Sequence, residues 1–263
     1  MAGKYITING HDLFYEIKGK GNNSIIFIHG LCGNHKVWYK NIPAFASKYK
    51  VLAIDIFGHG NSSKEISPKW AFESMASVIK KLIEKEGLQR VVLIGHSIAG
   101  NILLNCMEEN PRNVVAYVFV DCPFNATERV VNSRNKLAGT LLANPPHQIN
   151  TAIMKWYKTM MDMNASSDDN NLILSSLKNL DAKWALDFAK TTNFVRKVPQ
   201  IWLPILIFES DWLTKDEPER SFTRALPHAN YFHWPVSNHF FFVYQAGKFN
   251  KILQEFLDKN LPE

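Results

Sequence analysis

The sequence predicts an α/β fold: a mostly parallel β-sheet flanked by helices, with a helical segment inserted in the second half of the chain. Three observations lead to this prediction. In the first half, short apolar runs rich in β-branched residues alternate with longer amphipathic segments. Strand signals then stop near residue 123 and return only near residue 205. The 263 residues, 46% of them hydrophobic, are enough to bury one large core without disulfides or metal ions.

The elements of the first half follow from the spacing of the apolar residues. Residues 5–8 and 13–17 alternate in polarity around Asn9-Gly10, which predicts a β-hairpin. Continuous apolar runs, typical of strands covered on both faces, occupy residues 24–28, 51–55, 91–94 and 114–120. Helical stretches between these strands occupy residues 36–47, 70–86 and 98–110. Strands joined by helices favour parallel pairing with right-handed crossovers.

The pattern changes after residue 122. Amphipathic stretches without strand signals predict helices at residues 126–142, 148–163, 171–180 and 182–193. Strands are predicted again at residues 205–208 and 229–234, followed by a helix at 244–258. We therefore predict a core formed by residues 1–122 and 199–263, and a helical cap formed by residues 123–198.

Composition and charge argue against several functions. The 30 Lys and Arg residues exceed the 24 Asp and Glu residues, for a net charge of +6, but they are scattered along the chain. Nucleic-acid binding, which needs a concentrated basic surface, is therefore not expected. No apolar stretch has the length of a signal peptide or a membrane span, so we expect a cytoplasmic protein that does not enter a membrane. Cys32, Cys106 and Cys122 form neither a paired framework nor a zinc-ligand pattern, and we expect free thiols and no metal.

The most informative stretch is Gly95-His96-Ser97-Ile98-Ala99, which joins a predicted buried strand to a predicted helix. A nucleophile at the tip of such a sharp turn has strained backbone and needs small residues two positions to either side. The helix that follows also directs its N-terminus, which favours negative charge, toward the serine. The simpler alternative is a serine that only caps the helix.

This stretch resembles the nucleophile elbow of the α/β-hydrolase superfamily, G-x-S-x-G, with Ala99 in place of the second glycine. The resemblance implies a catalytic triad with Ser97 as nucleophile, followed along the chain by an acid and a histidine. His239 comes after the last predicted strand, where the superfamily has its catalytic histidine.

The acid is the least defined member of the triad. The superfamily carries it after the strand predicted at 205–208, which favours Asp211, although the usual glycine before it is missing. Glu209 and Asp216 are neighbouring alternatives. Some family members instead use an acid after the preceding strand, which here is Asp121.

Two further motifs support the resemblance. His29-Gly30-Leu31 follows the strand at 24–28 and resembles the superfamily's H-G-x loop, which implies that the Leu31 and Ile98 amides form the oxyanion hole. The segment from Asp55 to Ser62 is similar to D-x-R-G-x-G-x-S, with Phe57 in place of the arginine, and is expected to shape a structural loop.

The resemblance implies a serine hydrolase that needs no cofactor and cleaves a carboxylic ester, or a related acyl bond, of a small and largely apolar substrate. The reaction would pass through an acyl-enzyme on Ser97. Substrate choice is expected to lie in the cap, which is rich in Met and aromatic residues. A lactone, thioester, amide or C–C bond hydrolase is an alternative, and so is a low-turnover ligand receptor on the same fold. The natural substrate and the oligomeric state are left open.

Overall fold

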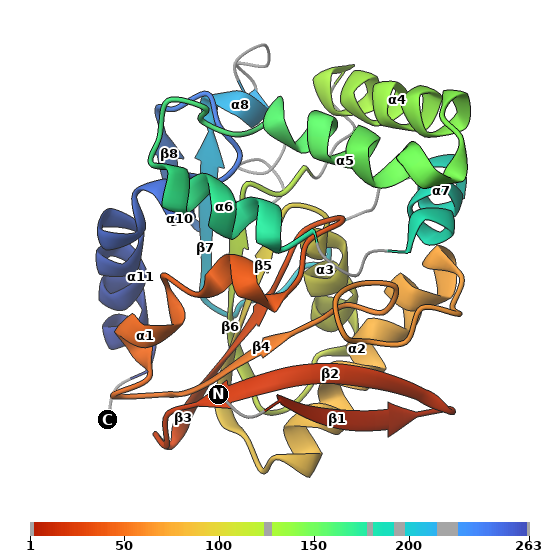
Figure 1. Ribbon diagram of the computed structural model, residues 1–263. Helices are drawn as coiled ribbons and strands as arrows, with labels where there is room; N and C mark the ends of the chain where they lie inside the picture. The colour runs from red at the N-terminus through yellow and green to blue at the C-terminus, as the bar shows by residue number, and fades with distance from the viewer. Residues whose placement is uncertain (1–2, 124–127, 178–180, 192–197, 215–225, 262–263) are drawn as a thin grey trace.

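The computed structural model describes residues 3–123, 128–177, 181–191, 198–214 and 226–261. Its centre is an eight-stranded sheet with the strand order β1-β2-β4-β3-β5-β6-β7-β8 (Figure 1). The strands are β1 (Gly3–Ile8), β2 (His11–Lys18), β3 (Asn23–Ile28), β4 (Lys50–Ile54), β5 (Gln89–His96), β6 (Val114–Val120), β7 (Ile205–Ser210) and β8 (Asn230–Trp234). Strands β3 to β8 run parallel, as the sequence predicts.

The first two strands form the predicted hairpin. Ile8 pairs with His11 across the turn. Asn9 and Gly10 have φ angles of +53° and +81°, and a type I′ turn requires positive φ at both of these positions. The hairpin joins the sheet through antiparallel pairing of β2 with β4, so the sheet is mixed at this edge.

Alternate residues of the central strands face two separate apolar layers. On β3, Ile26 and Ile28 belong to one layer, whereas Ile25 and Phe27 belong to the other, and all four are fully buried. Helices α2 (Pro68–Lys85) and α3 (Ala99–Glu109) cover the first layer, and α1 (Ile42–Phe45) and α11 (Ala246–Asn260) cover the second. Each such side chain contributes about 1.5–3 kcal/mol by leaving water, so the sheet is fixed from both sides.

One predicted helix is divided in the structure. Residues 36–47 form a 3₁₀ turn, η1 (His35–Trp38), followed by the short helix α1. Pro43 lacks an amide N–H and therefore fits only the first turn of a helix, which is where it stands in α1. At the other end of the chain, the predicted helix is preceded by a short helix, α10 (Phe241–Tyr244).

The described residues between β6 and β7, which we call the inserted segment, contain helices, as the amphipathic spacing predicts. The described elements of this segment are α4 (Glu128–Ala143), η2 (Pro146–Gln148), α5 (Ile149–Lys158), α6 (Ser167–Ser175) and α7 (Ala182–Thr191). Helix α6 begins earlier than predicted because the Ser166 hydroxyl accepts a hydrogen bond from the Asp169 amide and caps it. Figure 1 shows α4 and α5 at the upper right, near the end of the molecule toward which the arrow of β7 points. Among the described residues, no helix is long and apolar enough to cross a membrane.

Candidate active site

Ser97 stands at the sharp turn between β5 and α3. Its φ of +55° lies in the left-handed region, which costs a residue with a side chain about 1–2 kcal/mol. A Cβ on Gly95 would lie 3.1 Å from the Cβ of Ala99, which is tighter than ordinary van der Waals contact, so a side chain at Gly95 would push the strand and the helix apart. The strained turn expected from the sequence is therefore present, with alanine accepted two positions after the serine.

His239 lies on the loop between β8 and α10 and is 3% exposed. Its Nδ1 is 2.6 Å from Asp121 Oδ2. Because a carboxylate can only accept, Nδ1 carries the hydrogen and Nε2 keeps its lone pair. Burial lowers the pKa of His239 to about 3, which keeps the ring neutral at pH 7. A neutral imidazole in this tautomer can take a proton from a hydroxyl group at Nε2.

Asp121 directly follows β6 and has a φ of +50°. It is fully buried, and Ser210 holds its carboxylate in place beside His239. The Ser210 amide donates to Oδ1 at 2.8 Å, and the Ser210 hydroxyl lies 2.9 Å from Oδ1 and 2.8 Å from Oδ2. Ser210 is the last residue of β7, the strand that pairs with β6. Two neighbouring strand ends thus fix the carboxylate that faces the histidine.

The prediction that Asp211 lies against His239 is wrong. Strand β7 continues to Ser210, and Asp211 begins the short helix α8 (Asp211–Thr214) without an intervening loop. Its Oδ1 accepts instead from His233 Nε2 at 2.7 Å, and the side chains of Asp211 and His233 are 35% and 39% exposed. Asp211 therefore bonds a partly exposed histidine, and the bond to the buried His239 is made by Asp121 instead.

The other candidate acids are also accounted for. Glu209 is buried and accepts from the Tyr231 hydroxyl at 2.7 Å. Asp216 lies outside the described residues. Of the acids considered from the sequence, Asp121 is the one whose carboxylate bonds His239 in the described part of the chain.

The loop after β3 is fixed by its own polar groups. The Gly30 carbonyl accepts from the Gly33 amide at 3.2 Å and from His29 Nδ1 at 2.7 Å. The Cys32 amide donates to His59 Nε2 at 3.0 Å. Burial lowers the pKa of His29 to about 4 and that of His59 to about 3, so both rings act as neutral hydrogen-bonding groups.

The two amides expected to form an oxyanion hole remain available. Within the described part of the chain, neither the Leu31 amide nor the Ile98 amide donates to a protein group. Both residues line the same cavity as Ser97 and His239. Four of the five predicted site residues are therefore brought together, and Asp211 is the exception.

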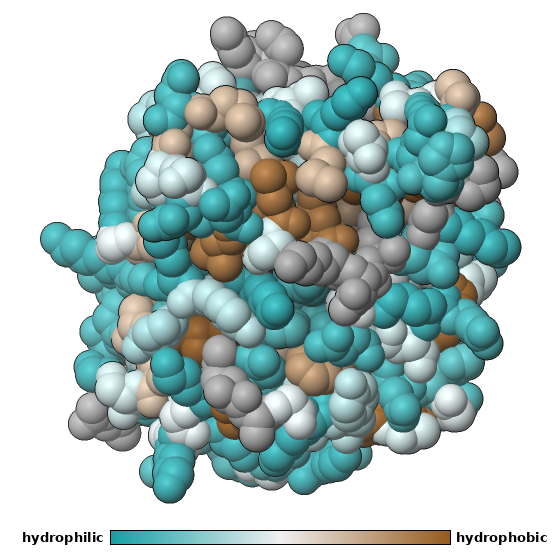
Figure 2. Space-filling view, in the orientation of Figure 1, coloured by the Kyte–Doolittle hydropathy of each residue, from teal (hydrophilic) through white to brown (hydrophobic). Residues whose placement is uncertain are grey.

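The cavity is apolar and has an empty volume of about 680 Å³ that includes the solvent at its mouth. Besides the four residues above, its described lining consists of Gly30, His96, Pro123, Leu137, Trp156, Tyr157, Met160, Phe188, Trp212 and Phe240. None of these lining residues is Asp, Glu, Lys or Arg. Figure 2 shows apolar side chains gathered around α5 and α6 on a face that is otherwise mostly hydrophilic. No cluster of His, Cys, Asp and Glu among the described residues is arranged to hold a metal ion.

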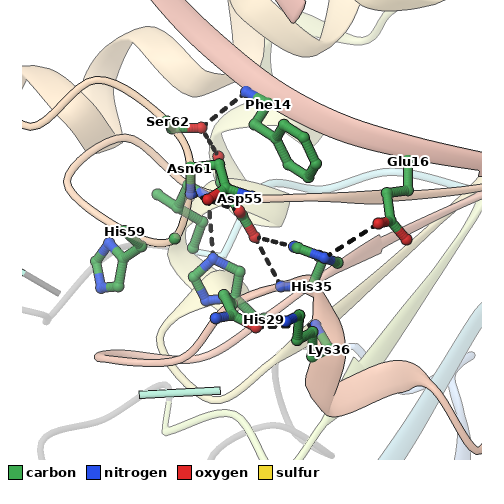
Figure 3. Close-up of polar contacts among 12 residues, drawn as sticks. Phe14, Glu16, His29, His35, Lys36, Asp55, His59, Asn61 and Ser62 are labelled. Carbon is green, nitrogen blue, oxygen red and sulfur yellow. Dashed lines mark hydrogen bonds and ion pairs between the residues drawn. The ribbon is translucent and has the colours of Figure 1, made fainter. Parts of the chain in front are cut away.

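The segment resembling D-x-R-G-x-G-x-S is bonded to the residues that follow β3, among them His29 and His35 (Figure 3). Asp55 is fully buried, and its carboxylate accepts from the amide and Nδ1 of His35, each at 2.7 Å, and from the Asn61 amide at 2.8 Å. A Cβ on Gly60 would overlap this carboxylate. The Ser62 hydroxyl donates to the Asp55 carbonyl and accepts from the Phe14 amide. These contacts fit the structural role expected for the segment.

The comparison with protein families agrees with this geometry. Residues 23–246 match the model of the family described as the alpha/beta hydrolase fold. The chain belongs to this family. The match includes β3 to β8, the turn with Ser97 and the loop with His239.

Individual relatives of this α/β hydrolase are distant. The chain is 28% identical over 119 residues to the dihydrolipoyllysine-residue acetyltransferase component of an acetoin cleaving system from Cupriavidus necator. The aligned residues make up 45% of this chain and 32% of that protein. The match thus spans about a third of that relative's length. Among solved structures, an esterase from Exiguobacterium antarcticum superposes with a TM-score of 0.84 at 16% identity, over 98% of this chain and 100% of that one. The enol-lactonase from Burkholderia xenovorans LB400 gives 0.76 at 17% identity, over 97% of this chain and 99% of that one.

Several residues that shape the site carry no signal in the sequence. Ser210 has no distinguishing pattern around it, because a serine at the end of a strand is common. His96, next to Ser97, packs its ring 4.4 Å from that of His239 and donates through Nε2 to the His239 carbonyl at 3.0 Å. Tyr157 and Met160 come from the inserted segment and meet the site only after folding.

Proposed function

We propose that this α/β hydrolase cleaves carboxylic esters of small, uncharged, largely apolar substrates by way of an acyl-enzyme on Ser97. His239 is the general base and acid, and Asp121 orients it. The Leu31 and Ile98 amides hold the oxyanion. The observation that carries this proposal is the bond between Asp121 Oδ2 and His239 Nδ1. His239 also lines the same cavity as Ser97.

The reaction proceeds in two halves. His239 Nε2 takes the Ser97 hydroxyl proton while Oγ attacks the ester carbonyl, and the carbonyl oxygen becomes an oxyanion held by the two amides. Asp121 stabilises the imidazolium that forms. When the C–O bond breaks, His239 gives the proton to the leaving alcohol. Water then repeats these steps on the acyl group and releases the carboxylic acid and free Ser97.

The lining of the cavity supports the substrate class. A charged acyl or alcohol group would lose its hydration without gaining a charged partner, because the described lining has no Asp, Glu, Lys or Arg. The aromatic rings of the lining instead suit apolar or aromatic groups; they belong to Trp156, Tyr157, Phe188, Trp212 and Phe240.

The test is ester turnover with a matched pair of variants. We expect the wild-type chain to hydrolyse p-nitrophenyl acetate and butyrate, and to act much more slowly on an ester with a charged acyl group such as p-nitrophenyl hemisuccinate. Ser97→Ala should abolish hydrolysis, whereas Ser77→Ala on α2, outside the cavity, should leave it unchanged. Equal turnover by Ser97→Ala would contradict the mechanism. Absence of turnover by the wild type over a broad ester panel would favour the low-turnover receptor instead.

A further inference from the structure

Helix α5 of the inserted segment reaches the loop after β3 through one side chain. The Tyr157 hydroxyl donates to the Leu31 carbonyl oxygen at 2.5 Å. Tyr157 is 3% exposed, and its ring lies 5.4 Å from that of Phe240, the residue after His239. Packing therefore fixes the ring, and the hydroxyl group is directed at the loop rather than at solvent.

With this contact, three of the four polar groups in two consecutive peptides have a hydrogen-bond partner. The peptide between Leu31 and Cys32 is held at both ends, since its carbonyl accepts from Tyr157 and its N–H donates to His59 Nε2. In the preceding peptide, the Gly30 carbonyl is bonded by Gly33 and His29. The Leu31 N–H is then the one polar group of these two peptides without a partner in the described part of the chain.

We propose that Tyr157 is a positioning residue of the oxyanion hole, through which α5 sets the direction of the Leu31 amide. The role of that amide rests on the proposed function. The same segment also holds the histidine, because the His239 amide donates to the Met160 carbonyl at 2.8 Å. The inserted segment thus lines the cavity and holds two loops. One loop carries the Leu31 amide, and the other carries His239.

Replacing Tyr157 by Phe removes the hydroxyl and keeps the ring. The half-buried Leu31 carbonyl then lacks its partner, and the peptide is held at one end only. Removing an oxyanion donor outright typically costs about 10²–10³ in turnover, so tilting one should cost less, roughly tenfold in kcat. KM should change little, because the ring that lines the cavity is still present.

Tyr244 offers a matched control. Its hydroxyl donates to Asn170 Oδ1 at 2.7 Å and accepts from the Asp162 amide at 3.1 Å, so it also ties the inserted segment to the core. Neither of these bonds involves the loop after β3. If Tyr157 only attached the inserted segment to the core, Tyr157→Phe and Tyr244→Phe would have the same effect on catalysis and on the loop after β3.

The experiment combines kinetics with amide hydrogen exchange of residues 30–34, followed by mass spectrometry. We expect Tyr157→Phe to speed exchange of this segment several-fold, to lower kcat for p-nitrophenyl acetate about tenfold and to weaken a trifluoromethyl ketone inhibitor by a similar factor. Tyr244→Phe should show none of these changes. Unchanged loop exchange, or an equal effect of both variants, would overturn the inference. If exchange rises but the wild type hydrolyses no ester, the proposed function fails while the positioning of the loop by Tyr157 stands.

Discussion

Asp121 and Asp211 show how surroundings decide which carboxylate can serve a buried histidine. Asp121 is fully buried and bonded by Ser210, whereas Asp211 is partly exposed and pairs with the similarly exposed His233. An exposed pair of this kind contributes at most about 1 kcal/mol and has no means of orienting a second ring. The buried pair of Asp121 and His239 fixes the tautomer on which the proposed proton transfer depends.

This difference predicts opposite outcomes for two conservative variants. Asp121→Asn should lower kcat for p-nitrophenyl acetate by about three to four orders of magnitude, because an amide in place of the carboxylate favours the wrong tautomer of His239. Asp211→Asn should change kcat less than about twofold, since its partner is an exposed histidine. Steady-state kinetics on both proteins checks this prediction. The reverse pattern would indicate that Asp211, which follows β7, is the acid of the triad.

Sequence patterns and structure agree for those elements whose conformation depends on local interactions. The Asn9-Gly10 hairpin and the apolar strands follow from backbone preference and burial, and the turn at Ser97 follows from the small residues around it. Amphipathic spacing alone predicts one helix over residues 36–47, but a separate helix, with Pro43 in its first turn, begins at Ile42 inside that range.

The contacts of Asp121 could not be predicted from local sequence. The position of Asp121 depends on β6 and β7 pairing, and these strands are separated by the entire inserted segment. The contact of Tyr157 with Leu31 has the same origin, since 126 positions separate the two residues. Such contacts are set by topology rather than by any motif.

Helix α7 rests on the loop that contains Gly58. A Cβ on Gly58, whose φ is +85°, would overlap the indole of Trp184, which also stands with its ring 4.5 Å from that of His59. Gly10 has a similar φ of +81°, but a Cβ added there would meet no atom of the described residues within 4 Å. Both glycines thus have a backbone conformation that would strain a residue with a side chain, but Gly58 alone of the two contacts α7.

We expect replacement by alanine to destabilise the protein more at Gly58 than at Gly10. Gly10→Ala should lower the free energy of unfolding by about 1 kcal/mol, from backbone strain. Gly58→Ala should lower it by about 1–3 kcal/mol more, because Trp184 must move. Urea denaturation of both variants measures the difference. Equal losses would show that α7 does not pack on this loop as described.

On the scale of the whole molecule, the buried neutral histidines make stability depend on pH. Burial lowers the pKa of His29 to about 4, lowers those of His59 and His239 to about 3, and lowers that of His96 well below its ordinary value. In the unfolded chain these groups titrate near 6.5. Between these values the unfolded state binds more protons, so stability is lost as the pH falls below about 6.5.

We therefore expect the free energy of unfolding to be steady above pH 7 and to fall steeply between about pH 6.5 and 4. Each histidine that stays neutral in the folded state contributes a slope of up to about 1.4 kcal/mol per pH unit. Urea titrations at pH 7.5, 6 and 5 check this expectation. A free energy of unfolding that is the same at pH 7.5 and pH 5 would contradict the burial of these rings in neutral form.

The proposed function depends on the activation of Ser97 by His239, and covalent labelling measures this activation. A fluorophosphonate probe reacts with a serine whose hydroxyl proton a neighbouring base can take. After incubation of the intact chain, mass spectrometry should show one added phosphonyl group, located on the peptide that contains Ser97. Ser97→Ala should remain unlabelled, and Asp121→Asn should react far more slowly. Absence of a label on Ser97 in the folded wild type, or an equal label in Ser97→Ala, would contradict the account.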